Sequence, residues 1–265
     1  TRLNSSAASD VYKRQAIATV IYYALHRQNI FHSGQFSGIN QALVITLFSM
    51  AMFAVDDFTK YFVHRWMHNW SVLWAFHKVH HSAETMTPIT VYRVHPAEGI
   101  LFGLRSAVSQ GIVISIFIFL FGNAVDLYTI VGVNILVFFF HMTGSNLRHS
   151  HINIRYWKWL EYIFISPAQH QLHHSIAEEH YDKNFGAALA VWDWLFGSLH
   201  LSESDQEITY GLTQDPTAPK SLSDMYFGPF GDILNIVAKY LTRSKKNLFS
   251  SSTEKPFEAR FWPRN

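Results

Sequence analysis

The sequence predicts an all-α, integral-membrane helical bundle, with about four membrane helices and a histidine-rich helical cap. Hydrophobic residues make up 49% of the chain and charged residues only 15%, whereas about 25% of an ordinary soluble domain is charged. Several apolar runs approach the roughly 20 residues that span a bilayer. Histidines recur at helical spacing near the ends of these runs.

The apolar runs place the helices in order along the chain. A short run at 16–25 predicts a partial membrane helix, and a longer one at 39–63 continues into the first histidines. Two further runs, 99–121 and 124–141, flank a Gly-Asn turn and predict a helical hairpin at 99–141. A hairpin returns the chain to the membrane face it left, so all the histidine clusters are expected on one face. Lys and Arg are concentrated on that face, which predicts that it is cytoplasmic.

Three regions are expected. Residues 1–15 are polar and are interpreted as a non-native or disordered leader. Residues 16–200 form the membrane domain. Residues 201–265 form a polar C-terminal extension with one short apolar helix near 232–241.

The overall charge and the absence of cysteine exclude several functions. The net charge is +2, and no basic stripe is interleaved with aromatic residues, so nucleic-acid binding is not expected. Without cysteine the chain has no disulfide, no thiolate-ligated iron–sulfur cluster and no cysteine nucleophile. No glycine-rich dinucleotide motif follows a strand, so the chain is not expected to bind a nicotinamide cofactor.

The histidine pattern predicts a metal site. Residues three or four apart share a helix face, and the sequence repeats such spacings. The repeats are His64-x-x-x-His68, His77-x-x-His80-His81 and His170-x-x-His173-His174. Neutral imidazole is a common ligand of transition metals, and eight histidines exceed the four of a tetrahedral site, which suggests two ions. The chain contains neither Glu-x-x-His nor His-Glu-x-x-His, which argues against a carboxylate-bridged bundle and a zincin protease.

These motifs resemble the fatty acid hydroxylase/sterol desaturase superfamily of integral-membrane oxygenases. The match covers roughly residues 40–200 and extends through Arg93-x-His95-Pro96, Asn184-Phe-Gly186 and Trp192-Asp193-x-x-Phe196-Gly197. The resemblance implies a centre of two iron ions that uses O2 to hydroxylate or desaturate a lipid or sterol C–H bond. It also implies one further histidine ligand between the second and third boxes.

The candidate metal ligands combine the boxes with that extra position. His149 and His151 both lie in this region; because residues two apart cannot share a helix face, only one is expected to bind, and His141 is a weaker third candidate. The ligand set is His64, His68, His77, His80, His81, His149, His151, His170, His173 and His174. Asp57, His95 and Asn184 are candidate partners that orient the ligands, although each also suits a helix end, a loop cap or a turn. No catalytic group beyond the metal centre is identified.

Such an oxygenase needs electrons from an external donor: a ferredoxin, a cytochrome or a reductase. The residues alone leave other functions open. A zinc-dependent membrane hydrolase would use the same histidines without electrons, and a metal transporter or sensor would bind the ion without chemistry. Transporters place their ligands near the middle of the bilayer, whereas these boxes lie past the predicted helix ends, which favours an interfacial site.

Overall fold

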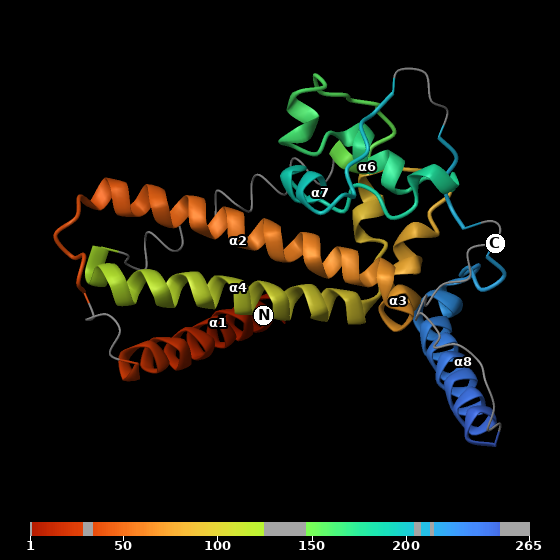
Figure 1. Ribbon diagram of the computed structural model, residues 1–265, viewed down its shortest axis with the longest axis horizontal. Coiled ribbons are helices and arrows are strands. Elements are labelled where there is room, and N and C mark those ends of the chain that lie inside the picture. Colours follow the sequence, from red (N-terminus) through yellow and green to blue (C-terminus); the bar gives the residue numbers. More distant parts are fainter. Residues whose placement is uncertain (1, 29–33, 125–146, 204–207, 213–214, 250–265) are drawn as a thin grey trace.

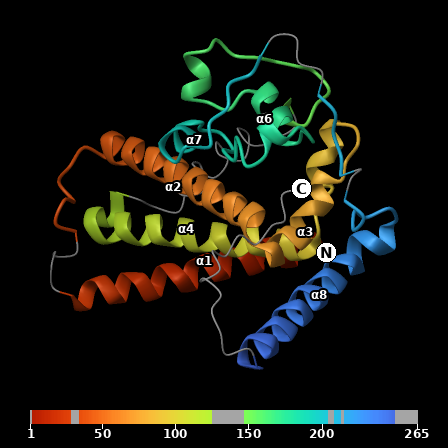
Figure 2. The same cartoon turned by 45° about the vertical axis from the view of Figure 1, so that its right-hand side comes forward.

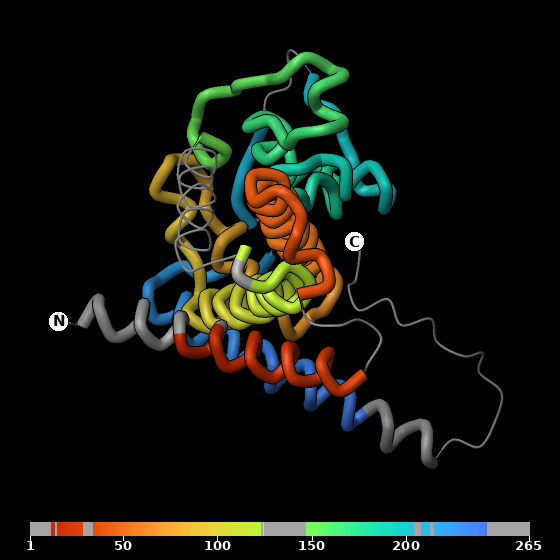
Figure 3. The backbone as a smooth tube through the Cα atoms, turned by 90° about the vertical axis from the view of Figure 1, so that its left-hand side faces the viewer, coloured from red at the N-terminus to blue at the C-terminus, as the bar shows by residue number. Residues whose placement is uncertain are grey.

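Three long helices lie side by side and form the body of the molecule (Figures 1 and 3). They are α1 (Arg2–Arg27), α2 (Gln41–Asn69) and α4 (Pro96–Phe121). The computed structural model describes residues 2–28, 34–124, 147–203, 208–212 and 215–249. Over these ranges the protein is helical, with isolated bridges in place of strands. The all-α prediction is confirmed.

Local sequence sets the ends of the two central helices. The side chain of Asn40 accepts hydrogen bonds from the backbone N–H groups of residues 42 and 43 and begins α2. His95 caps α4, with Pro96 at its first position, and Gly122 ends α4 with a φ of 61°. Both helices are long and apolar enough to cross a membrane.

The bundle is held by apolar packing and by ion pairs to the buried carboxylate of Asp56. Val44, Phe48 and Met52 of α2 pack against Val113, Ile114 and Phe121 of α4. Farther along, Arg105 of α4 pairs with Asp56 of α2 at 3.0 Å, and Lys60 reaches the same carboxylate. Helix α1 packs along α4, where the Ser115 hydroxyl donates to the Ala18 carbonyl over 2.8 Å.

The predictions for residues 1–15 and for the hairpin at 99–141 can be compared with this bundle. Residues 2–15, which we expected to be a non-native or disordered leader, continue α1 as helix. The first arm of the predicted hairpin is α4, whereas the second arm lies in residues 125–146, outside the described residues.

The cap gathers at the end of α2, where α3 (Ser71–His81) departs (Figures 1 and 2). It contains the short helices η1 (Pro88–Tyr92), η3 (Leu160–Tyr162), α6 (Pro167–His173), η4 (Glu178–His180) and α7 (Val191–Leu195). Beyond it lies α8 (Leu222–Phe249), within the segment predicted as a polar extension. That segment is joined to the cap by Ser202, whose N–H and hydroxyl donate to Glu161.

The helices of the cap are short, and buried carboxylates hold the loops between them in place. Asp193 accepts the N–H groups of Phe185 and Gly186 at 2.8 and 2.7 Å, and the Ser198 hydroxyl at 2.6 Å. Asp57 of α2 accepts the N–H groups of Ala188 and Leu189. These bonds satisfy backbone donors that no helix or sheet satisfies, and they tie the cap to α2.

Gly186 provides a test of this packing. A Cβ there would lie 2.6 Å from the Leu189 carbonyl oxygen and 2.8 Å from an Asp193 carboxylate oxygen. We expect Gly186→Ala to destabilise the protein by about 1–3 kcal/mol through overpacking. The readout is the melting temperature of the detergent-solubilised protein. The control is Gly103→Ala in α4, where nothing lies within 4 Å and Ala favours the helix by about 1 kcal/mol. Equal melting temperatures for the two variants would contradict this account.

Candidate metal centre

Three helices bring the histidine boxes together. His64 and His68 lie one turn apart near the end of α2. The chain turns at Trp70, which is extended with φ −106° and ψ 115°, and α3 then presents its own histidines. Helix α6 is held by a capping box between Ser166 and Gln169 and brings the third box against the other two.

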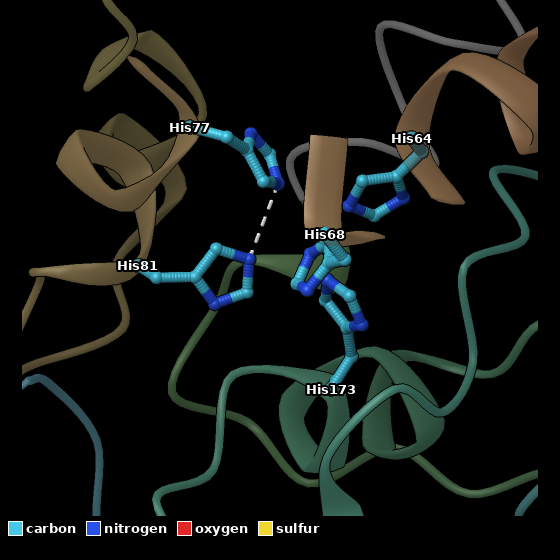
Figure 4. A group of neighbouring side chains, drawn as sticks. All are labelled: His64, His68, His77, His81 and His173. Atoms are coloured by element: carbon cyan, nitrogen blue, oxygen red, sulfur yellow. Dashed lines mark hydrogen bonds between the residues drawn. The ribbon is translucent and has the colours of Figure 1, made fainter. Parts of the chain in front are cut away.

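The first group contains five imidazoles whose donor atoms all lie within 4.8 Å of one another. They come from α2, α3 and α6 and point toward a common centre (Figure 4); they are His64, His68, His77, His81 and His173. The Nε2 atoms of His77 and His81 are 3.2 Å apart. Two nitrogens bonded to one ion at about 2.1 Å each are at most about 4.2 Å apart. The donor atoms of this group, which lie up to 4.8 Å apart, would need only small shifts to share an ion.

The second group contains four buried imidazoles: His80, His149, His170 and His174. Here the Nε2 atom of His149 lies 3.1 Å from that of His80 and 3.0 Å from that of His170. The two groups adjoin, because the rings of His81 and His174 stack with centroids 4.4 Å apart. The arrangement is therefore a pair of neighbouring nitrogen-lined sites.

Partners behind the rings fix which nitrogen faces each site. The Nδ1 atoms of His64 and His173 lie 2.8 and 2.7 Å from the carbonyl oxygens of Phe185 and Lys183. The Nδ1 atom of His80 lies 3.3 Å from the Arg93 carbonyl oxygen. A carbonyl accepts only from a protonated Nδ1, which leaves Nε2 as a lone pair directed inward.

Burial keeps these imidazoles neutral. It lowers the pKa of His77 to about 3 and that of His80 to about 4. Burial, reinforced by neighbouring imidazoles, also holds the pKa values of His81, His170, His173 and His174 well below the usual value. At neutral pH these rings carry no charge, which is the form that binds a metal.

The donor set fits metal ions on two further grounds. Nε2 atoms of His68, His173 and His174 are buried and have no hydrogen-bond partner among the described residues. Buried polar atoms are rarely left so, and a metal would satisfy them. Every donor in the two groups is an imidazole nitrogen, a type that suits zinc, copper, iron or nickel rather than magnesium or calcium.

Glu98 was not among the residues predicted from the sequence. This residue is buried in the first turn of α4, and its Oε1 atom lies 3.0 Å from Nδ1 of His77. It is the carboxylate counterpart of the three backbone carbonyls described above. The available signal was an acidic residue in the first helical turn, three positions after His95.

The structure does not bring three expected residues against a ligand imidazole. Asp57 is occupied by the backbone N–H groups of residues 188 and 189 and by the Trp192 indole. His95 caps α4, and its Nε2 atom contacts the Tyr226 carbonyl oxygen. Asn184 donates to the carbonyls of Gln169 and His200. These three side chains therefore bond to backbone groups, and Asp57 also to the Trp192 indole, instead of to a ligand imidazole.

Burial distinguishes His149 from His151, the two candidate histidines between the second and third boxes. His149 is buried and belongs to the second group, whereas His151 is exposed and belongs to neither group. The expectation that one of the pair lies at the site matches this geometry, with His149 as that residue. His141 lies outside the described residues.

The chain is similar to proteins named as a monooxygenase, a lipid hydroxylase and a sterol desaturase. A human alkylglycerol monooxygenase is 26% identical over 157 residues, which are 59% of this chain and 31% of that protein. The ornithine lipid hydroxylase OlsE of Rhizobium tropici is 26% identical over 198 residues, 75% of this chain and 53% of that protein. The Delta(7)-sterol 5(6)-desaturase ERG3A of Gibberella zeae is 25% identical over 208 residues, 76% and 52% respectively.

The chain thus spans about a third to a half of the length of these curated relatives. No solved structure gives a significant match. The family model for fatty acid hydroxylases matches residues 49–198, more than half of the chain, and this range holds all nine imidazoles of the two groups. The chain belongs to the fatty acid hydroxylase family.

Proposed function

We propose that this protein is a membrane oxygenase that uses O2 and two iron ions to hydroxylate or desaturate a C–H bond of a lipid or sterol. The observation that carries the proposal is the pair of adjoining groups of buried, neutral imidazoles. Five and four nitrogen donors are enough for two ions that retain open positions. The relatives, named as a lipid hydroxylase, a monooxygenase and a sterol desaturase, support oxygen chemistry over the hydrolase and transporter alternatives.

The protein residues would hold and insulate this centre. The nine histidines supply the ligands, and the carbonyls of Arg93, Lys183 and Phe185 keep three of the rings in the correct tautomer. Phe185 packs edge-on against the rings of His64 and His68 and excludes water from that side. When bound, the pair of iron ions supplies the redox chemistry that activates oxygen toward a C–H bond.

The substrate and the electron donor must approach such a centre from different directions. A lipid or sterol would come from the apolar bundle of α2 and α4. Electrons would come from a ferredoxin, a cytochrome or a reductase docked on the cap, because the chain has no nicotinamide motif of its own. The excess of Lys and Arg around the boxes supports a cytoplasmic cap and suits an acidic donor.

Metal analysis tests the proposal directly. We expect the protein purified without oxygen to contain two irons per chain and to consume O2 when it is chemically reduced. Prolonged treatment with a chelator should remove the metal and abolish oxygen consumption, and added Fe²⁺ should restore it. A single zinc per chain, with no oxygen consumption after reduction, would refute the oxygenase.

A matched pair of variants tests the second group. We expect His149→Ala to lose metal from the group formed with His80, His170 and His174, while the five-histidine group still binds. His151→Ala should keep full metal content, because its side chain is exposed outside both groups. The measurement is metal per chain for each purified variant. Full loading of His149→Ala, or metal loss in His151→Ala alone, would remove His149 from the site.

Glu98→Gln tests the carboxylate behind His77. Glutamine preserves the size of the side chain but removes the carboxyl group whose oxygen lies against Nδ1 of His77. We expect metal affinity to fall about 10- to 100-fold, as for other partners of this kind. Affinity is measured as metal retained against increasing chelator, with the exposed Glu179→Gln as control. Identical retention by the two variants would show that Glu98 does not tune the site.

A further inference from the structure

Among the described residues, the contacts of helix α8 with the body involve α3 and the start of α4. Its Asp232 forms an ion pair with Lys78 of α3, and Phe230 contacts Phe76 with ring centroids 5.6 Å apart. Near its start, the Tyr226 carbonyl oxygen lies 3.1 Å from Nε2 of His95. These contacts hold the helix against α3, beside the end of the bundle that carries the histidines.

An apolar face of α8 is largely exposed, and it shares Tyr226 and Phe230 with the attached face. Apart from the adjacent pair at 226 and 227, its residues recur at intervals of three or four, the spacing of one helix face, and each is at least 46% exposed. They are Tyr226, Phe227, Phe230, Leu234, Val237 and Leu241. Such a continuous apolar row on a helix surface marks an interaction site rather than ordinary scatter.

The remaining face of α8 is polar. Asp224, Asn235, Lys239 and Thr242 are exposed on it. The sequence then continues with Arg243, Lys245 and Lys246 in the last turns of the helix. A helix with an apolar row, a separate polar face and a basic end has the composition of helices that lie in a membrane interface.

The direction of α8 agrees with that composition. Helices α2 and α4 have the length and hydropathy of membrane spans, and α8 runs steeply across their direction at the end where α3 departs (Figures 1 and 2). If α2 and α4 cross the bilayer, a helix set across them at this end would run along the membrane surface.

We propose that α8 is an in-plane membrane helix: its row from Tyr226 to Leu241 inserts among the lipids on the side of the histidine cap, and its basic end faces anionic headgroups. The apolar row provides the burial, at about 25 cal/mol per Å² of apolar surface, and the basic residues add attraction to an anionic leaflet. A second copy of the chain or a protein partner would instead cover the same row with protein.

The first turns of α8 also line a cavity of about 470 Å³. Its other walls include Val79 of α3 and the segment from Tyr92 to Pro96. One of these residues, Arg93, holds the ring of His80 through its carbonyl. Seating α8 on the bilayer would place this cavity at the level of the lipid headgroups.

The test uses the absence of cysteine from the chain. Leu234→Cys and Asn235→Cys introduce adjacent, exposed positions on the apolar and polar faces of α8. Each full-length variant is labelled with a small fluorophore and reconstituted into phosphatidylcholine vesicles containing phosphatidylglycerol. Quenching is then measured with brominated lipids and, separately, with iodide present on both sides of the membrane.

We expect brominated lipid to quench the probe at position 234 several-fold more than the probe at 235, and iodide to show the reverse order. Iodide quenching at 234 equal to that at 235 would overturn the proposal, because the row would then face water. Protection of position 234 from both quenchers would overturn it in favour of a protein partner. Strong lipid quenching at both positions would overturn the in-plane placement. Unchanged metal content in both variants confirms that the cap is folded.

Discussion

The main constraint on this structure is that the imidazoles of the two groups must direct their lone pairs inward. A neutral imidazole has one N–H and one lone pair, and its orientation is set by whatever accepts the N–H. Here the acceptors are the carbonyls of Arg93, Lys183 and Phe185 and the carboxylate of Glu98. If an acceptor were lost, its ring could rotate or change tautomer, and the lone pair would leave the site.

Three of those acceptors are backbone carbonyls in short loops, so the loops themselves must be rigid. Asn184 lies between Lys183 and Phe185 and adopts a φ of 55°. Its side chain bonds to the backbone of Gln169 and of His200. His95 lies between Arg93 and Glu98 and caps α4. Thus two residues that we expected to touch ligands act one step farther out, by fixing the backbone whose carbonyls and carboxylate do so.

The ligand histidines are predictable from the sequence, whereas the groups that orient them are not. The spacing of the histidine boxes identifies His64, His68 and the other box residues because a helix converts spacing directly into a shared face. No such rule relates Glu98 to His77, because their contact depends on how α4 approaches α3. The roles of Asp57 and Asn184 were equally hidden, since a carboxylate or amide next to a ligand box serves an imidazole or a backbone N–H with the same chemistry.

Helix length explains why the site lies at the end of the bundle. Helix α2 has 29 residues, about 43 Å at 1.5 Å per residue, whereas the hydrocarbon core is about 30 Å thick and needs roughly 20 residues. About 20 residues from Gln41 reach Tyr61, and the same count back from Phe121 reaches Phe102.

His64, His68 and Glu98 lie beyond those limits, at the interface. Arg105 and Asp56 lie just inside them, where charge is costly, and they pair with each other. The cap can therefore supply the carbonyl and carboxylate acceptors that the imidazoles need in a polar layer, while the apolar bundle ends directly against the site.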